Sequence, residues 1–149
     1  MKLTSTAFEH ETHIPKQYTC DGHNINPPLQ ISDVPDGIKS FALIVYDPDV
    51  PRDLRPDGNF DHWLVFNIPP DTREILEAHE PLGKHGMNTS GRTKYFGPCP
   101  PDKEHRYFFK LYALDTLLSL PEKSTRKEIE TAMQHHILAT AELMGIYGR

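Results

Sequence analysis

The chain has 149 residues, a formal net charge of -5 and a sequence pI of about 6.0. This length predicts one domain, residues 1–149, and the acidic balance argues against a nucleic-acid-binding protein, which usually has a basic footprint. No apolar run approaches the roughly 18 residues of a membrane span, and the first residues lack the apolar core of a signal peptide. We therefore expect a soluble, cytoplasmic protein.

Buried strands are predicted in chain order at 39–47, 62–69 and 106–115, where the sequence reads KSFALIVYD, HWLVFNIP and RYFFKLYALD. Each has apolar residues on both faces of the two-residue repeat, which is typical of a strand buried between layers. A shorter strand is predicted at 28–34 and a short helical turn at 71–78. The 14 prolines favour a loop-rich β protein, because proline is confined to turns, sheet edges and helix starts.

One helix is predicted after these strands, beginning at Thr125. Thr125 and Glu128 fit a capping box, and apolar residues from Ile129 to Met144 recur at helical spacing. Gly145 is a natural stop for this helix. The helix would pack on the β core; the alternative is that it forms the contact of a homodimer, with His135 and His136 on it.

Two cysteines, Cys20 and Cys99, are too few for a disulfide framework in a chain of this length. In a reducing cytosol we expect free thiols most of the time. The sequence does not indicate whether the two lie close together.

Ionisable side chains gather at the ends of the three predicted strands. Asp47 and Asp49 end the first strand, His62 begins the second, and His105 and Tyr107 begin the third. If the first two strands are antiparallel neighbours, and the third runs parallel to the second, these side chains meet at one edge of the sheet. Two imidazoles, a carboxylate and a phenol would then line one concave spot. The nearby prolines would hold its rim rigid at little entropic cost.

Each of these residues also has a purely structural interpretation. The segment DPDVP is a common turn pattern, and a histidine at a strand start is more often a packing residue than a ligand. Tyr107 could face the core, and Cys99 could be a small buried hydrophobe. The Arg106 side chain alternates away from its neighbours, so we expect it to form a salt bridge with one of the DPDVP carboxylates.

The order DPDVP, HWLVFNIP, GPCPP, HRYFFKLYALD resembles the phosphatidylethanolamine-binding protein family, which includes the Raf kinase inhibitor proteins of animals. The opening YTCDGHNINPPLQ is similar to the shorter prokaryotic branch. The resemblance extends from about residue 2 to 120, and the two segments DPDVP and GPCPP followed by HRY are specific in combination.

The resemblance implies a mainly β fold, a sandwich of a large antiparallel sheet on a smaller one plus the C-terminal helix. It also implies non-enzymatic binding, without a cofactor or metal, of a small anion such as phosphate, acetate, cacodylate or phosphorylethanolamine. Regulation of a protein partner such as a kinase is implied as well. The ligand-binding positions carried over are Asp47, Asp49, Pro51, His62, Gly97, Pro98, Cys99, Pro100, His105 and Tyr107.

Three departures from the family pattern affect the expected pocket. Only residues 102–104 separate Pro101 from His105, which predicts a more open mouth. Phe60 stands where many relatives have tryptophan, and the segment 52–61 lacks a tyrosine found in animal members. We therefore expect a simple anion site in place of a selective headgroup site.

The chemistry of the predicted site rests on its histidines. A protonated imidazole donates two hydrogen bonds to an oxyanion, Tyr107 adds a hydroxyl donor, and Asp47 would favour the charged form of His62 or His105. Anion affinity is then expected to fall as pH rises through roughly 6 to 8.

Two enzymatic alternatives use the same cluster of Asp47, His62, Cys99 and His105. The first is a metal-dependent hydrolase that also uses Asp49, although no recognised metal-ligand spacing is present. The second is nucleophilic catalysis by Cys99 with His105, which the flanking prolines disfavour because they supply no backbone N–H donors.

Overall fold

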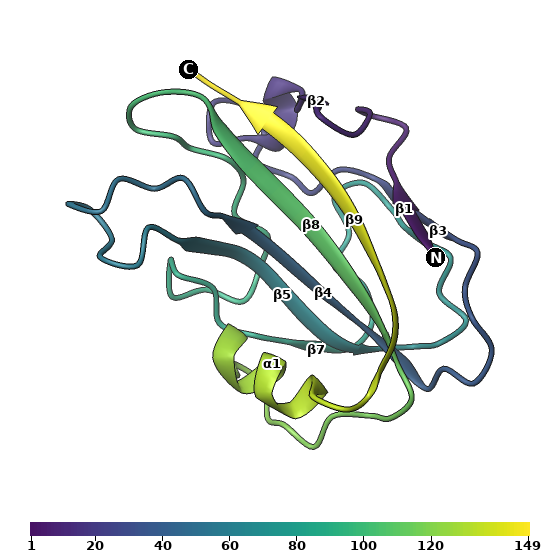
Figure 1. Ribbon diagram of the computed structural model, residues 1–149. Coiled ribbons are helices and arrows are strands. Elements are labelled where there is room, and N and C mark those ends of the chain that lie inside the picture. The colour runs from purple at the N-terminus through teal and green to yellow at the C-terminus, as the bar shows by residue number, and fades with distance from the viewer.

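The computed structural model describes residues 1–149 as two packed sheets (Figure 1). The large sheet has the order β2-β9-β8-β4-β5-β7 and the small sheet the order β1-β3-β6. Apart from the short parallel pair β2–β9, all neighbouring strands are antiparallel, so the predicted mainly β architecture is confirmed. The strands are β1 Lys2–Thr4, β2 Thr12–His13, β3 Leu29–Ser32, β4 Ser40–Asp47, β5 Phe60–Ile68, β6 Glu74–Ile75, β7 Lys84–His85, β8 His105–Leu114 and β9 Ile137–Tyr147.

Strand β4 lies in the middle of the large sheet and is buried on both faces, as predicted. Its residues Phe41, Leu43 and Val45 join the main core between the two sheets. Ala42 and Ile44 point to the opposite face, into a smaller apolar cluster. Burial of both faces explains why the strand reads as a nearly continuous apolar run.

The two neighbours of β4 are β5 and β8, and both run antiparallel to it. They are therefore parallel to each other across β4, which confirms the arrangement on which the predicted polar cluster depends. The C-terminal end of β4 and the N-terminal ends of β5 and β8 meet at one end of the sheet. This end carries Asp47, His62 and His105.

The predicted C-terminal helix is correct at its start and wrong in its length. Helix α1 spans Arg126–Met133 and begins with the expected capping box of Thr125 and Glu128. His135 then adopts a left-handed conformation, with φ of 71°, and 137–147 forms β9, which pairs with the whole length of β8. The strand outcompetes the helix because β8 would otherwise leave a long row of backbone groups unpaired at the sheet edge.

Gly145 has a different role from the helix stop that was predicted. It lies inside β9, where Phe8 and Ile14 pack directly against its backbone. A Cβ at this position would lie 2.8 Å from a ring carbon of Phe8, closer than carbon atoms approach. Glycine therefore permits close packing of the N-terminal segment on the strand.

Helix α1 packs on the sheet through Ile129 and Met133, which join the apolar cluster on the outer face of β4 and β5 (Figure 1). The helical turn predicted at 71–78 is absent; this segment contains β6, paired with β3. The other helix is the short 3-10 helix η1, Lys16–Tyr18. No helix has the length and hydrophobicity that crossing a bilayer requires.

Candidate functional site

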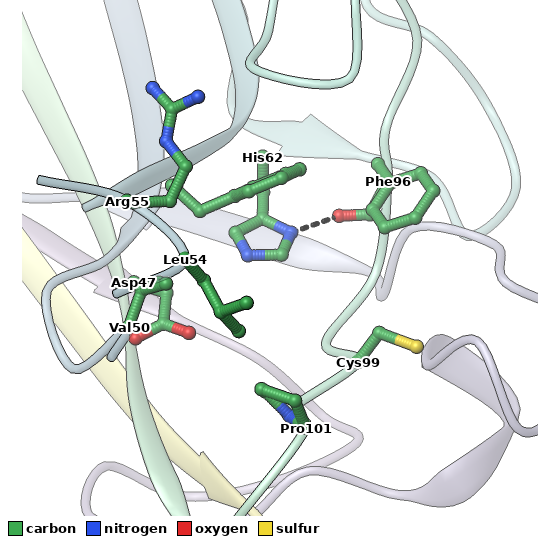
Figure 2. Close-up of a pocket in the computed structure, with 9 residues that line it drawn as sticks. Asp47, Val50, Leu54, Arg55, His62, Phe96, Cys99 and Pro101 are labelled. Carbon is green, nitrogen blue, oxygen red and sulfur yellow. Dashed lines mark hydrogen bonds between the residues drawn. The ribbon is translucent and has the colours of Figure 1, made fainter. Parts of the chain in front are cut away.

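A cavity of about 290 Å³ opens at the end of the sheet where β4, β5 and β8 meet (Figure 2). Strand pairing places it there, because Asp47 at the end of β4 is the register partner of Phe60 at the start of β5. The loop after β4 and the segment before β8 form the remaining walls. The lining residues are Asp47, Val50, Leu54, Arg55, Phe60, His62, Phe96, Cys99 and Pro101.

His62 lies at the centre of the cavity wall as a neutral imidazole. Its Nδ1 is 2.5 Å from the carbonyl oxygen of Phe96, so this nitrogen carries the hydrogen and donates it. Burial lowers the pKa of His62 to about 4. Its Nε2 has no hydrogen-bond partner in the protein and points to the side of the cavity where Asp47 and Leu54 lie (Figure 2). His62 was expected to be a protonated hydrogen-bond donor. In the structure it is a neutral imidazole, and its free nitrogen is an acceptor.

His105 is fully buried, and both of its ring nitrogens are occupied by carboxylates. Nδ1 is 2.6 Å from Asp47 Oδ2, and Nε2 is 2.7 Å from Asp102 Oδ1. Burial alone would lower the pKa of His105, but the two carboxylates outweigh it and raise the pKa above its usual value. The expectation that Asp47 favours a charged histidine is met at His105. Its two N–H groups are committed within the protein.

Asp102 is a residue that the sequence analysis did not select. The short segment between Pro101 and His105 was expected to open the mouth of the pocket. In the structure this segment brings the Asp102 carboxylate back onto the imidazole of His105, three residues later; the openness of the mouth stays a prediction. The hydrogen bond from His105 lowers the pKa of Asp102.

Asp49 and Arg106 form the salt bridge that the sequence predicted. The guanidinium contacts both carboxylate oxygens, at 2.9 Å from Nε and 2.8 Å from an Nη, and the Arg106 backbone N–H also donates to Asp49. Asp47 in turn accepts the backbone N–H of Asp49 at 2.7 Å. These contacts fasten the loop after β4 to the start of β8.

The structure separates the predicted ligand-binding residues into two groups. Asp47, His62 and Cys99 line the cavity. The others support its walls from outside: Asp49, Pro51, Gly97, Pro98, Pro100, His105 and Tyr107. Gly97, for example, has no space for a side chain, because Tyr18 and Asn24 pack against it, and its N–H donates to Asn24 Oδ1 at 2.7 Å.

Tyr107 is buried beside both histidines. Its ring centroid is 5.4 Å from that of His62 and 6.4 Å from that of His105. Its hydroxyl has no hydrogen-bond partner, and burial, followed by the charge of Asp47, raises its pKa. A neutral phenol in this position is an available donor behind the cavity wall.

Arg55 lines the cavity and brings a positive charge to it, and the sequence analysis did not select it. Its Nε is buried without a hydrogen-bond partner, and the nearby Asp57 Oδ1 is 4.0 Å from it. The backbone N–H groups of Leu54 and Arg55 donate to Pro51 O, so a tight turn places Arg55 at the cavity rim. Its guanidinium is directed away from His62 (Figure 2). The sequence signal that could have pointed to Arg55 was the length of the loop 47–61, since long loops in compact domains are often functional.

The two cysteines form a disulfide, so the expectation of free thiols is not met. Their Cα atoms are 5.4 Å apart although 79 positions separate them in sequence. The fold brings them together because the segment after Phe96 runs along the loop after η1, where Cys20 N–H donates to Pro98 O at 3.1 Å. Cys99 thus links a cavity wall covalently to the N-terminal segment.

The geometry affects both enzymatic alternatives. The Cys99 sulfur is bonded to Cys20, so nucleophilic catalysis would first require this bond to be opened. No group of three or more His, Cys, Asp or Glu side chains converges as metal ligands would. Asp49 and His105, two of the suggested ligands, are engaged in ion pairs.

Comparison with known proteins places this architecture in a family. The family model described as phosphatidylethanolamine-binding protein matches residues 4–148. The chain belongs to the phosphatidylethanolamine-binding protein family. A solved homologue of that family from Chlamydia trachomatis is 49% identical, with a TM-score of 0.97 over 99% of this chain and 97% of that one. YbcL of Escherichia coli, described as a member of the mammalian family, is 31% identical with a TM-score of 0.87, over 98% of this chain and 96% of its own.

Relatives known from sequence include a UPF0098 protein of Chlamydia pneumoniae. It is 50% identical over 147 residues, which cover 99% of this chain and 98% of the relative. Another UPF0098 protein, from Methanothermobacter thermautotrophicus, is 44% identical over 100% of this chain and 99% of its own. The family resemblance seen in the signature segments is thus confirmed along the whole chain.

The charge state of His62 is directly testable. We expect ¹⁵N NMR to show an Nδ1–H tautomer that stays neutral from pH 8 down to pH 5 and titrates near the pKa of about 4. Because the unfolded imidazole binds a proton near pH 6.5, this group makes the fold more stable as pH rises from about 4 to 6.5. A titration of His62 near pH 6.5 would contradict the assignment.

Proposed function

We propose that the cavity binds a small ligand with a phosphate monoester or a similar oxyanion, and that the protein does so without converting it chemically. The observation that carries this proposal is a pair of groups at one cavity, the unpartnered acceptor Nε2 of His62 and the half-exposed guanidinium of Arg55. Family membership supports the same role, because ligand binding is typical of such proteins.

The neutral His62 selects the protonation state of the ligand. Its Nε2 accepts a hydrogen bond, so the group placed against it is a donor, such as the P–OH of a phosphate monoanion. The half-exposed Arg55 side chain is free to turn its guanidinium toward the ligand and balance the remaining charge through charge-assisted hydrogen bonds. Apolar walls from Phe60, Phe96 and Leu54 exclude water around this contact, which strengthens it.

The volume and rigidity of the cavity suit a ligand of headgroup size. About 290 Å³ is at the lower end of the range for small-molecule sites. The walls are held by the Asp49–Arg106 pair, the Asp47–His105 pair and the disulfide. A site held in this way needs little ordering when the ligand binds. Regulation of a kinase or another protein partner stays a prediction.

Phosphorylethanolamine binding should weaken as pH rises. Its second phosphate proton is lost near pH 6, and the resulting dianion has no donor for His62. The direction agrees with the sequence-based expectation, but the titrating group is the ligand. We expect isothermal titration between pH 5 and 8 to show this decrease, whereas glycerophosphorylethanolamine, a diester, should bind with an affinity independent of pH.

Substitutions test the contributions of Arg55 and His62 separately. Arg55→Ala should weaken phosphorylethanolamine binding about tenfold or more, the usual effect of losing a charge-assisted hydrogen bond. Arg92→Ala, which removes an exposed arginine outside the cavity, is the matched control; Arg52 is unsuitable because its side chain donates to Pro56 O within the loop that carries Arg55. His62→Phe should abolish the pH dependence. Equal affinity for ethanolamine, which has no phosphate, or no saturation at millimolar phosphorylethanolamine would refute the proposal.

A further inference from the structure

The cavity wall formed by residues 99–101 has few attachments to the rest of the protein. Cys99 and Pro101 line the cavity, yet the backbones of Cys99, Pro100 and Pro101 make no hydrogen bond. The two prolines have no N–H to donate. Hydrogen bonds resume only on either side, at Pro98 O and at the Asp102 carboxylate. Pro100 is buried, so the wall is held by packing and by one covalent link, the disulfide.

The other end of the disulfide is well anchored. The loop that carries Cys20 follows η1 and is closed by the Gly22 N–H to Thr19 O hydrogen bond at 3.1 Å. Asp21, next to Cys20, accepts hydrogen bonds from Tyr147 at 2.6 Å and from Arg149 at 2.9 Å. The loop thus acts as a fixed support to which the disulfide holds the wall.

We propose that the Cys20–Cys99 disulfide is a redox control site for the cavity: a dithiol reductant opens it, and the reduced protein binds the ligand more weakly. This inference rests on the proposed function. The thiolate of the reductant attacks one sulfur and forms a mixed disulfide, releasing the other cysteine as a thiolate that takes up a proton. The second thiol of the reductant then resolves the mixed disulfide, so two electrons and two protons reach the protein and the reductant is oxidised.

The geometry permits this exchange without passage through the cavity. Both cysteines are partly exposed. The Cys99 sulfur points away from His62 and toward the N-terminal segment (Figure 2). A reductant can therefore approach from outside the site. Once the bond is open, the wall keeps its proline stiffness but loses its covalent support.

Ligand binding and disulfide stability are coupled in this arrangement. A loosened wall must be ordered again when the ligand binds, and this ordering costs binding free energy. The affinity should therefore fall about tenfold on reduction, which is the usual effect of immobilising one such segment. By thermodynamic linkage, a bound ligand must stabilise the disulfide by the same factor. An oxidising compartment would hold the high-affinity form and a reducing one the low-affinity form.

The test uses the full chain, oxidised or reduced with dithiothreitol. One readout is the affinity for phosphorylethanolamine, expected to be about tenfold weaker after reduction. The other needs no ligand: the amides of Cys20 and Gly97 donate hydrogen bonds beside the wall, to Pro98 O and Asn24 Oδ1, and their hydrogen exchange should accelerate on reduction, while that of the β4 amides should not. Double substitution of Cys20 and Cys99 by serine should reproduce the reduced state and be insensitive to dithiothreitol.

A stability control separates local loosening from general destabilisation. Ile129→Ala removes a buried side chain of α1, on the face of the sheet opposite the main core, and keeps the disulfide; its ligand affinity should match that of the wild type. Equal affinity of the oxidised and reduced forms would overturn the proposal. If neither form binds, the proposed function fails, and exchange decides the redox inference. Faster exchange at Cys20 and Gly97 supports the control site, and unchanged exchange there overturns it.

Discussion

Replacement of Asp47 by asparagine is expected to lower the free energy of unfolding by about 3 kcal/mol at pH 7, the typical cost of leaving one member of a buried ion pair without its partner. The Asp47 side chain is 5% exposed and the His105 side chain is fully buried, with 2.6 Å between Oδ2 and Nδ1. Asparagine keeps the size of the side chain, and its carbonyl can still accept the Asp49 N–H. The loss therefore reports the pairing of the imidazolium with Asp47, while its contact with Asp102 remains, and urea unfolding measures it.

Asp102→Asn is the matched control, because it removes the other carboxylate of the same imidazole. The Asp102 side chain is 41% exposed, so water replaces much of its interaction and the change should be clearly smaller. The double variant Asp47→Asn with His105→Gln should recover part of the loss, since it removes both buried charges. Similar losses in Asp47→Asn and Asp102→Asn would show that burial does not determine the strength of this pair.

The pH dependence of the Asp47→Asn effect follows from the raised pKa of His105. A group with a raised folded pKa stabilises the fold below its unfolded pKa, near 6.5 for histidine, and this stabilisation disappears as pH rises through the folded pKa. The difference in unfolding free energy between wild type and Asp47→Asn should therefore be largest near pH 6 and should shrink on the alkaline side. A difference that grows with pH would contradict a charged His105.

Removal of the disulfide is expected to cost about 4 kcal/mol of stability, because the bond closes a long loop in the unfolded chain. The two cysteines are 79 positions apart, so an open chain gains much conformational freedom on unfolding. We expect the urea midpoint of the wild type to fall when a reductant is present. A typical domain has a total stability of about 5–15 kcal/mol, so the reduced protein should remain folded with a small margin.

The double serine variant at Cys20 and Cys99 is the control for this measurement. Its midpoint should match that of the reduced wild type and should not respond to reductant. If reduction leaves the wild-type midpoint unchanged, the loop-closure effect is absent and the hydrogen bonds between the two segments suffice to hold them. This stability measurement needs no ligand, so it is independent of the affinity measurements.

Several elements follow from the local sequence pattern alone. Apolar residues on both faces identified the buried strands β4, β5 and β8, and the polar residues at their ends identified the end of the sheet that carries the cavity. The alternation of side chains along the strand predicted that Arg106 points away from His105 and pairs with an acidic residue of DPDVP. In the structure that residue is Asp49. These features need only a few neighbouring residues and a two-residue repeat.

Other features depend on residues that are distant in sequence, and they appear only in the folded chain. Residues 137–147 have a helical spacing of apolar side chains, but the open edge of β8 makes them a strand, and tertiary hydrogen bonding overrides local propensity. The Cys20–Cys99 bond requires two loops far apart in sequence to run side by side. The neutral state of His62 and the charged state of His105 follow from burial and nearby carboxylates. Desolvation and contact distance exist only once the chain has folded.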